Sequence, residues 1–126
     1  MNIGVRSVGL YVRDQDRAKR FWTETMGFEL VREMPLGDEP AGLRWIEVAP
    51  PDRSVLLVLF TPPEHADRIG SFSNIIFHCD DVQAAYRELS ARGVEFAEPP
   101  HRQFWGWWAV FRDPDGNTYG LGQRGD

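Results

Sequence analysis

The sequence of 126 residues contains the same pattern twice, once in each half. Residues 7–14 and 74–81 both read as a strand that ends in aspartate. A stretch with helical spacing follows each strand and ends at a glycine, Gly27 in the first copy and Gly93 in the second. The strands are 67 residues apart and the glycines 66, so one register holds through strand, helix and turn. An internal duplication therefore organises the chain.

The second part of each copy repeats as well, at a shift of 63 residues that places 43–57 over 106–120. Each segment reads as a strand, a Pro-Asp turn at 51–52 or 114–115, and a second strand. This is the pattern of a hairpin whose turn needs a preset φ and a left-handed position. Each copy is thus a βαβββ unit, and the fold class is α+β.

The boundaries of these units follow from periodicity and from turn residues. We expect one domain over 1–126, with repeats at about 3–60 and 72–123 and a linker at 61–71. A helix capped by Asp14 or Asp16 and another capped by Asp80 or Asp81 are expected. Pro99, Pro100 and His101 predict a loop. Strands are expected at 5–12, 28–34, 43–49, 54–60, 73–79, 94–97, 106–112 and 117–122.

Composition excludes several classes of function. A net charge of −5 with scattered arginines argues against a nucleic-acid partner and makes neutral or cationic ligands easier to accommodate. No apolar run is long enough for a membrane helix and no signal peptide is visible, so a cytoplasmic protein is expected. The single cysteine, Cys79, is expected to be a small buried hydrophobe.

The order of elements resembles the vicinal oxygen chelate superfamily, which includes glyoxalase I, bleomycin-resistance proteins, fosfomycin-resistance enzymes and extradiol dioxygenases. The resemblance rests on Val-Gly-Leu-Tyr-Val-Arg-Asp at 8–14, Phe-Trp-Thr-Glu-Thr-Met-Gly-Phe at 21–28 and Phe-Arg-Asp-Pro-Asp-Gly-Asn-Thr-Tyr at 111–119. It implies paired βαβββ modules whose sheets curl into a cup, commonly within a homodimer.

Metal-dependent members of this superfamily carry ligands on the first and last strand of each copy. The resemblance places these positions on Ser7, Leu57, Asn74 and Gly120. Divalent metals need imidazole, carboxylate or thiolate ligands, and none of these side chains offers one. We therefore expect no metal at the family position and no other cofactor.

Alternation along the strands predicts the residues that line the cleft. The middle strands are placed by analogy with the family, with Glu47 also pointing inward. The surface is mainly apolar and aromatic, as in a small-molecule pocket. Trp45 and Trp108 are related by the repeat and are suited to stacking on a planar or cationic ligand. The expected ligand-binding residues are Tyr11, Trp45, Val55, Leu57, Leu59, Asn74, Ile76, His78, Trp108 and Val110.

Two polar residues of this surface are candidates for catalysis. His78 has a side chain whose ordinary pKa is near neutrality, so it is a candidate general base or hydrogen-bonding anchor. Glu47, if it points inward and is poorly solvated, is expected to have a raised pKa and to be a candidate base. Both residues also have an ordinary interpretation, as strand residues that pack or face solvent.

The leading hypothesis is a metal-independent protein that binds a small apolar or aromatic organic molecule, with a cationic ligand among those it can accommodate, in the manner of bleomycin-resistance proteins. One alternative is an enzyme, either a cofactor-free isomerase or lyase that uses His78 and Glu47, or a glyoxalase- or dioxygenase-like enzyme with a displaced metal site. Another is an interaction module whose cleft is closed by side chains. A homodimer is expected, because the first strand of each small unit needs an edge partner.

Overall fold

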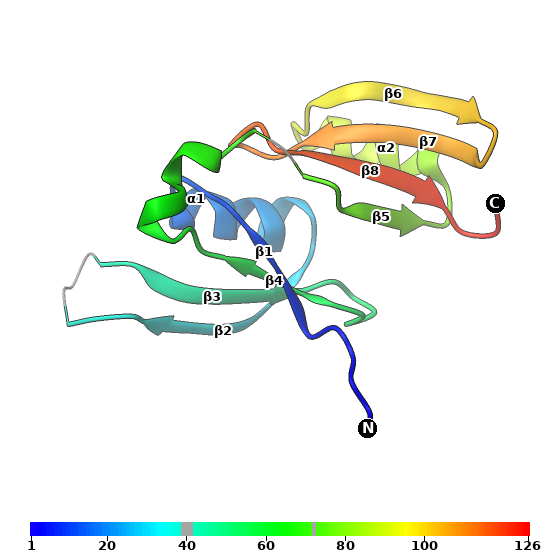
Figure 1. The fold of residues 1–126 in the computed structure, drawn as a ribbon. Helices are drawn as coiled ribbons and strands as arrows, with labels where there is room; N and C mark the ends of the chain where they lie inside the picture. The colour runs from blue at the N-terminus through cyan, green and yellow to red at the C-terminus, as the bar shows by residue number, and fades with distance from the viewer. Residues whose placement is uncertain (39–41, 72) are drawn as a thin grey trace. The chain divides into compact units, whose positions relative to one another are not determined.

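The computed structural model describes residues 1–38, 42–71 and 73–126. The chain divides into two compact units, Met1–Ile69 and Gly70–Asp126, called here the first and second module. Each module is one βαβββ unit, as the duplication predicts, and each has its own four-stranded mixed sheet (Figure 1). The boundary between the units falls inside the segment 61–71.

The first module has the strand order β1-β4-β3-β2, with β1 parallel to β4 and the other pairs antiparallel. Its helix begins at Asp14, whose Oδ1 accepts a hydrogen bond from the amide of Arg17 at 3.1 Å. The elements are β1 (Ser7–Leu10), α1 (Gln15–Arg20), the π-helical turn η1 (Phe21–Thr25), β2 (Glu29–Pro35), β3 (Arg44–Ala49), β4 (Leu56–Leu59) and the 3₁₀ turn η2 (Pro63–Arg68).

The second module repeats the plan with the strand order β5-β8-β7-β6, and β5 is parallel to β8. Asp81 caps its helix by accepting a hydrogen bond from the amide of Ala84 at 3.0 Å. The elements are β5 (Ile76–Cys79), α2 (Val82–Ala91), β6 (Phe96–Gln103), β7 (Gly106–Arg112) and β8 (Thr118–Gln123).

In each module the helix covers one face of the sheet. In the first module, Lys19 of α1 forms an ion pair at 3.0 Å with Glu33 of β2, and Glu33 lies directly opposite Ile46 of β3. The helix therefore covers the face of the sheet on which Glu33 and Ile46 lie. In the second module, Tyr86 of α2 contacts Phe96, which lies opposite Phe111. The other face of each sheet, turned away from its own helix, is called the open face.

The strand β6 is longer than the sequence predicts. The loop expected at Pro99–His101 is part of the strand, which runs from Phe96 to Gln103. Two proline residues are tolerated there because β6 is an edge strand, and its pairing with β7 is irregular between Phe96 and His101. The described part of the chain has no helix with the length and apolar character that crossing a membrane requires.

Candidate functional site

The pairing of β3 with β4 decides which residues share the open face of the first module. Glu47 lies directly opposite Val58, and Val58 opposite Gly9, so these three positions point to the same side. Trp45 and Arg32 belong to the same face, the first by alternation along β3 and the second because it lies opposite Glu47. The expected inward positions of Trp45 and Glu47 are thus on the face that the helix leaves open.

The expectation that Leu57 and Leu59 share this face with Glu47 is wrong. Leu57 lies opposite Val48 on the helix-covered side, and both leucines are buried in the core. Val55 precedes β4. The error is one residue of register, because the connection between β3 and β4 is one residue longer than its counterpart between β7 and β8. Glu47 pairs with Val58, whereas the equivalent Val110 pairs with Gly120.

Glu47 is held by two arginines on the open face. Its side chain is only 1% exposed, and its carboxylate accepts hydrogen bonds from Nη1 and Nη2 of Arg6 at 2.6 and 3.2 Å. Nε of Arg32 lies 3.7 Å from the same carboxylate. The hydrogen bonds from Arg6 hold the pKa of Glu47 below its ordinary value, although burial acts in the opposite direction. The expected rise in the pKa of Glu47 is therefore wrong.

Aromatic side chains lie next to this charged cluster. The rings of Trp45 and Phe60 are in contact, with centroids 5.8 Å apart. The hydroxyl of Tyr11 and Nδ1 of His65 are within hydrogen-bonding distance at 2.8 Å. Sequence analysis gives His65 no special role, and the structure shows it to be the polar partner of a predicted ligand-binding residue.

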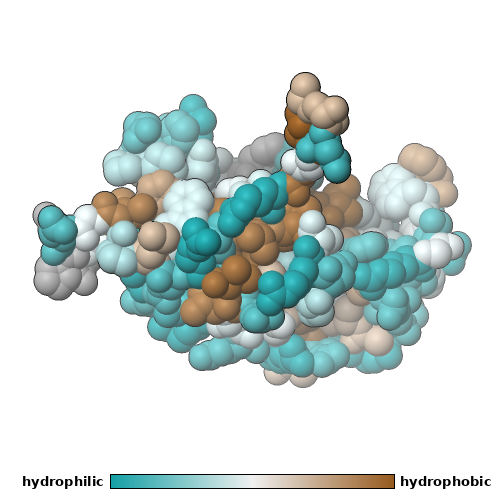
Figure 2. Space-filling model, turned by 90° about the horizontal axis from the view of Figure 1, so that it is seen from below, coloured by the Kyte–Doolittle hydropathy of each residue, from teal (hydrophilic) through white to brown (hydrophobic). Residues whose placement is uncertain are grey.

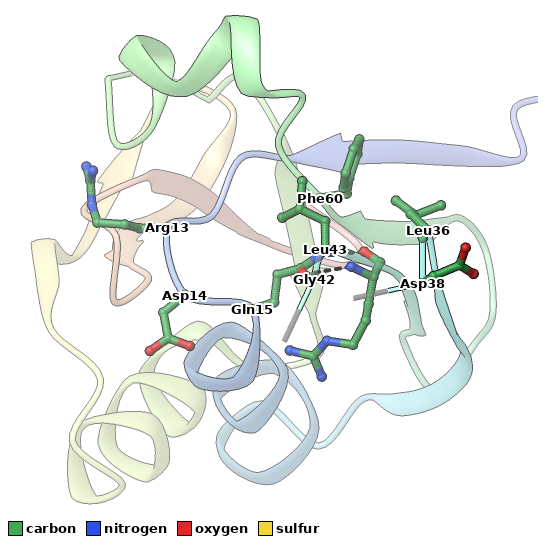
Figure 3. Close-up of a pocket in the computed structure, with 10 residues that line it drawn as sticks. Arg13, Asp14, Gln15, Leu36, Asp38, Gly42, Leu43 and Phe60 are labelled. Atoms are coloured by element: carbon green, nitrogen blue, oxygen red, sulfur yellow. Dashed lines mark hydrogen bonds between the residues drawn. The ribbon is translucent and has the colours of Figure 1, made fainter. Parts of the chain in front are cut away.

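Phe60 also lines a pocket of about 910 Å³ beside the turn that leads into α1 (Figure 3). Leu36 and Leu43, which follow β2 and precede β3, contribute further apolar surface to the pocket, and Arg13 and Asp38 contribute charge. The amide of Leu36 donates a hydrogen bond to the carbonyl of Leu43 at 3.0 Å, which joins the two sides. The pocket thus combines apolar walls with charged groups.

Gln15 forms the buried polar support of this pocket. Its Nε2 donates hydrogen bonds to the carbonyls of Arg44 and Leu59 at 2.6 and 2.7 Å, and its Oε1 accepts one from the amide of Arg44 at 3.0 Å. One side chain therefore ties the start of α1 to both β3 and β4. Figure 3 shows the side chain of Gln15 pointing toward Gly42 and Leu43.

The open face of the second module carries Trp108, Val110 and Ile76. Val110 lies opposite Gly120, and Gly120 opposite Ile76, which is 66% exposed. His78 is also exposed on β5, by alternation from Ile76, whereas Asn74 precedes the strand and is exposed. The structure therefore gathers most of the predicted binding residues of this module on one accessible face.

Trp108 lies over Gly120. A Cβ built on Gly120 would overlap the indole, with Cζ2 only 2.6 Å away. Trp108 also contacts Trp105, with ring centroids 5.5 Å apart in an edge-to-face arrangement. The position at which the family resemblance places a metal ligand is thus covered by an aromatic ring.

The residues at the family's metal position do not fit a divalent ion. Corrected for register, the position in β4 equivalent to Gly120 is Val58 rather than Leu57, and valine has no donor either. Ser7 and Asn74 supply only a hydroxyl and an amide. Among residues 1–38, 42–71 and 73–126, no three His, Cys, Asp or Glu side chains come together in a group suited to a metal.

The motif Asp113–Asn117 is a structural turn, as its composition predicts. Asp113 is buried and accepts hydrogen bonds from Asn117 Nδ2 and Tyr119 Oη at 2.9 and 2.7 Å. Burial raises the pKa of Asp113, and burial together with the nearby Asp113 raises that of Tyr119. The left-handed φ values of 87° at Gly116 and 53° at Arg53 mark the equivalent turns of the two modules.

Sequence analysis missed Arg6, Arg32, Phe60 and Gln15. Alternation finds Phe60 and Arg32 once the register of β4 and β2 is known, but no local signal links Arg6 to a glutamate 41 residues away. Figure 2 shows hydrophobic residues exposed on the surface, with hydrophilic residues between and around them. The mixture of apolar and charged groups suits a small organic ligand.

The sequence matches a known protein family. The model of the Glyoxalase/Bleomycin resistance protein/Dioxygenase superfamily matches residues 4–121. The chain is similar to YetH of Bacillus subtilis (strain 168), an uncharacterized protein, with 35% identity over 115 residues that cover 91% of this chain and 93% of YetH.

Solved structures show the same architecture. A member of the superfamily from Sphaerobacter thermophilus DSM 20745 has a TM-score of 0.85 and 32% identity, covering 97% of this chain and 98% of its own. TnmS3, an antibiotic binding protein from Streptomyces sp. CB03234, has a TM-score of 0.83 and 38% identity, covering 98% of both chains.

Proposed function

The chain belongs to the Glyoxalase/Bleomycin resistance protein/Dioxygenase superfamily, and within it we propose that this protein binds a small aromatic organic molecule without a metal. The ligand is of the kind that an antibiotic binding protein such as TnmS3 takes up. We place its planar part against a tryptophan on the open face of a module, and the repeat supplies one such residue in each, Trp45 in the first and Trp108 in the second. Binding of this type needs neither an acid nor a base.

The observation that carries this proposal is the packing of Trp108 over Gly120. An indole covers the metal position of the second module, so this site offers aromatic surface where metal-dependent relatives would offer a ligand atom. The aromatic contact of Trp45 with Phe60, next to a pocket of about 910 Å³, supplies a second apolar surface in the first module.

Titration with the neutral fluorescent probe N-phenyl-1-naphthylamine tests the proposal. We expect saturable probe fluorescence and quenching of tryptophan emission, and a loss of affinity of about tenfold in Trp45→Ala or Trp108→Ala. Trp107→Ala is the matched control, because Trp107 alternates with Trp108 and points to the opposite face. Equal binding by all four proteins would contradict the proposal.

The enzymatic alternative has its own test. Glu47 acts as a base only if it is first released from Arg6, so the acid–base hypothesis rests mainly on the exposed His78. A panel of antibiotics is incubated with the protein and recovered for mass spectrometry, and we expect each bound compound to return unchanged. Conversion that His78→Ala abolishes, with binding retained, would favour the enzyme instead.

A homodimer is the assembly we propose. It is supported by the edge positions of β1 and β5 in their sheets and by exposed hydrophobic side chains such as Ile76 and Phe104, which are 66% and 96% accessible. Sedimentation velocity is expected to show twice the mass of the chain. A monomer at micromolar concentration would overturn this proposal.

A further inference from the structure

We propose that the ligand carries an anionic group, such as a carboxylate or sulfonate, and that Arg32 binds this group while the aromatic part lies on Trp45. The inference rests on the proposed function and names the class of molecule that the first module selects. It departs from the neutral or cationic ligands that the overall charge of −5 favours.

Local charge on the open face differs in sign from the charge of the chain. Arg6, Arg32 and Glu47 form one cluster, in which two guanidinium groups meet one carboxylate, so one positive charge is left over. The carboxylate is 1% exposed, whereas the side chains of Arg6 and Arg32 are 59% and 56% exposed. A ligand that approaches this face therefore meets guanidinium groups first.

Arg32 has hydrogen-bond donors that Glu47 does not use. Its Nε is the atom nearest to Glu47, at 3.7 Å, and Glu47 is its one ionic partner among the described residues. Its two terminal amino groups form no hydrogen bond with the described residues, and together they match the two oxygens of a carboxylate or sulfonate. Arg6, by contrast, already uses both terminal nitrogens on Glu47.

The aromatic surface lies within reach of Arg32. Arg32 is opposite Glu47 and Met34 is opposite Trp45, so Arg32 and Trp45 are diagonal neighbours on the same face, about 7–8 Å apart. That spacing is about the length of a fused two-ring aromatic group with an acidic substituent. Glu47 does not offer a cationic ligand a comparable contact, because Arg6 engages both of its carboxylate oxygens.

Two probes that differ only in a sulfonate test the inference. 1-Anilinonaphthalene-8-sulfonate is anionic, and N-phenyl-1-naphthylamine is its neutral counterpart. We expect the wild-type protein to bind the anionic probe more tightly, and Arg32→Gln to weaken that binding about tenfold while the neutral probe is unaffected. Added sodium chloride should weaken the binding of the anionic probe alone.

The chain offers a matched control and a variant that should have the opposite effect on affinity for the anionic probe. Arg53 is also 56% exposed and also pairs with a glutamate, Glu29, so Arg53→Gln makes the same change in net charge and exposure and should leave both affinities unchanged. Glu47→Gln removes the negative charge beneath the arginines and should tighten binding of the anionic probe.

The outcomes separate this inference from the function on which it rests. If neither probe binds, the proposed function fails and this inference fails with it. If both probes bind in a Trp45-dependent manner but Arg32→Gln has no more effect than Arg53→Gln, only this inference is overturned. Tighter binding of the neutral probe by the wild type would overturn it as well.

Discussion

The indole of Trp108 lies over the backbone of Gly120, on the neighbouring strand, at the point where any side chain on Gly120 would project. The glycine and the tryptophan are therefore a matched pair, because the ring can occupy this place only if position 120 has no Cβ. The same packing arrangement therefore explains why position 120 has no metal ligand and why an aromatic surface lies there.

Gly120→Ala is expected to destabilise the protein by about 1–3 kcal/mol, because the added methyl group must displace a packed ring. Urea unfolding, followed by far-UV circular dichroism, measures the loss. The cost should disappear in a Trp108→Val background, where the ring is absent, so a double-mutant cycle isolates the contact. An unchanged cost in that background would show that Trp108 is not its cause.

Glu47→Gln is expected to flatten the acid limb of the stability profile. The folded pKa of Glu47 lies below its ordinary value of 4.5, so the unfolded chain binds the proton more readily. Its contribution to stability is present above that value and is lost as pH falls through the folded pKa. Unfolding free energies of the wild type and Glu47→Gln, measured between pH 3 and pH 7, should show the change, and parallel profiles of the two proteins would contradict it.

Tyr119→Phe is expected to destabilise the second module by about 1–3 kcal/mol. The hydroxyl of Tyr119 donates a hydrogen bond at 2.7 Å to the buried carboxylate of Asp113, and its removal leaves that carboxylate with one donor fewer. Thermal unfolding checks the loss. Tyr86→Phe serves as the control, since it makes the same change on the partly exposed surface of α2; an equal effect of both substitutions would argue against the buried contact.

Gln15→Leu is expected to loosen the pocket of the first module. Leucine is similar in size but cannot hydrogen-bond, so the backbone groups of Arg44 and Leu59 would lose their partner, at about 1–3 kcal/mol for each buried group left unsatisfied. Hydrogen exchange should become faster in the amides of 42–46 and 57–61. Unaltered protection there would mean that Gln15 does not hold the pocket together.

The repeat and its elements could be predicted because they depend on local signals. Alternation, an aspartate cap at Asp14 and Asp81, and the glycines that end the helices all act within a few residues. The equivalent turns were also predictable, since Pro-Asp sequences favour this geometry. Only the edge position of β6 explains why Pro99 and Pro100 lie within a strand, and sequence does not reveal which strands are at an edge.

The site was less accessible to sequence analysis, because it depends on register and on distant partners. One extra residue between β3 and β4 exchanges the faces of β4, which placed Leu57 and Leu59 on the wrong side. The environment of Glu47 depends on Arg6, which approaches from far along the chain, and it reversed the expected direction of the pKa shift.

The sequence alone determined that two βαβββ units build this protein, because that conclusion needs only residue types and spacing. The family resemblance placed the metal positions on residues without an imidazole, carboxylate or thiolate. Tertiary structure decided which side chain covers the metal position of the second module and which charged groups lie on the open face of the first. Trp108 covers Gly120, and Arg6 and Arg32 surround Glu47, through contacts between strands that only the folded sheets bring together. The sequence gives the chemical groups of the side chains, whereas strand register decides the face to which each side chain points and the residues that it contacts.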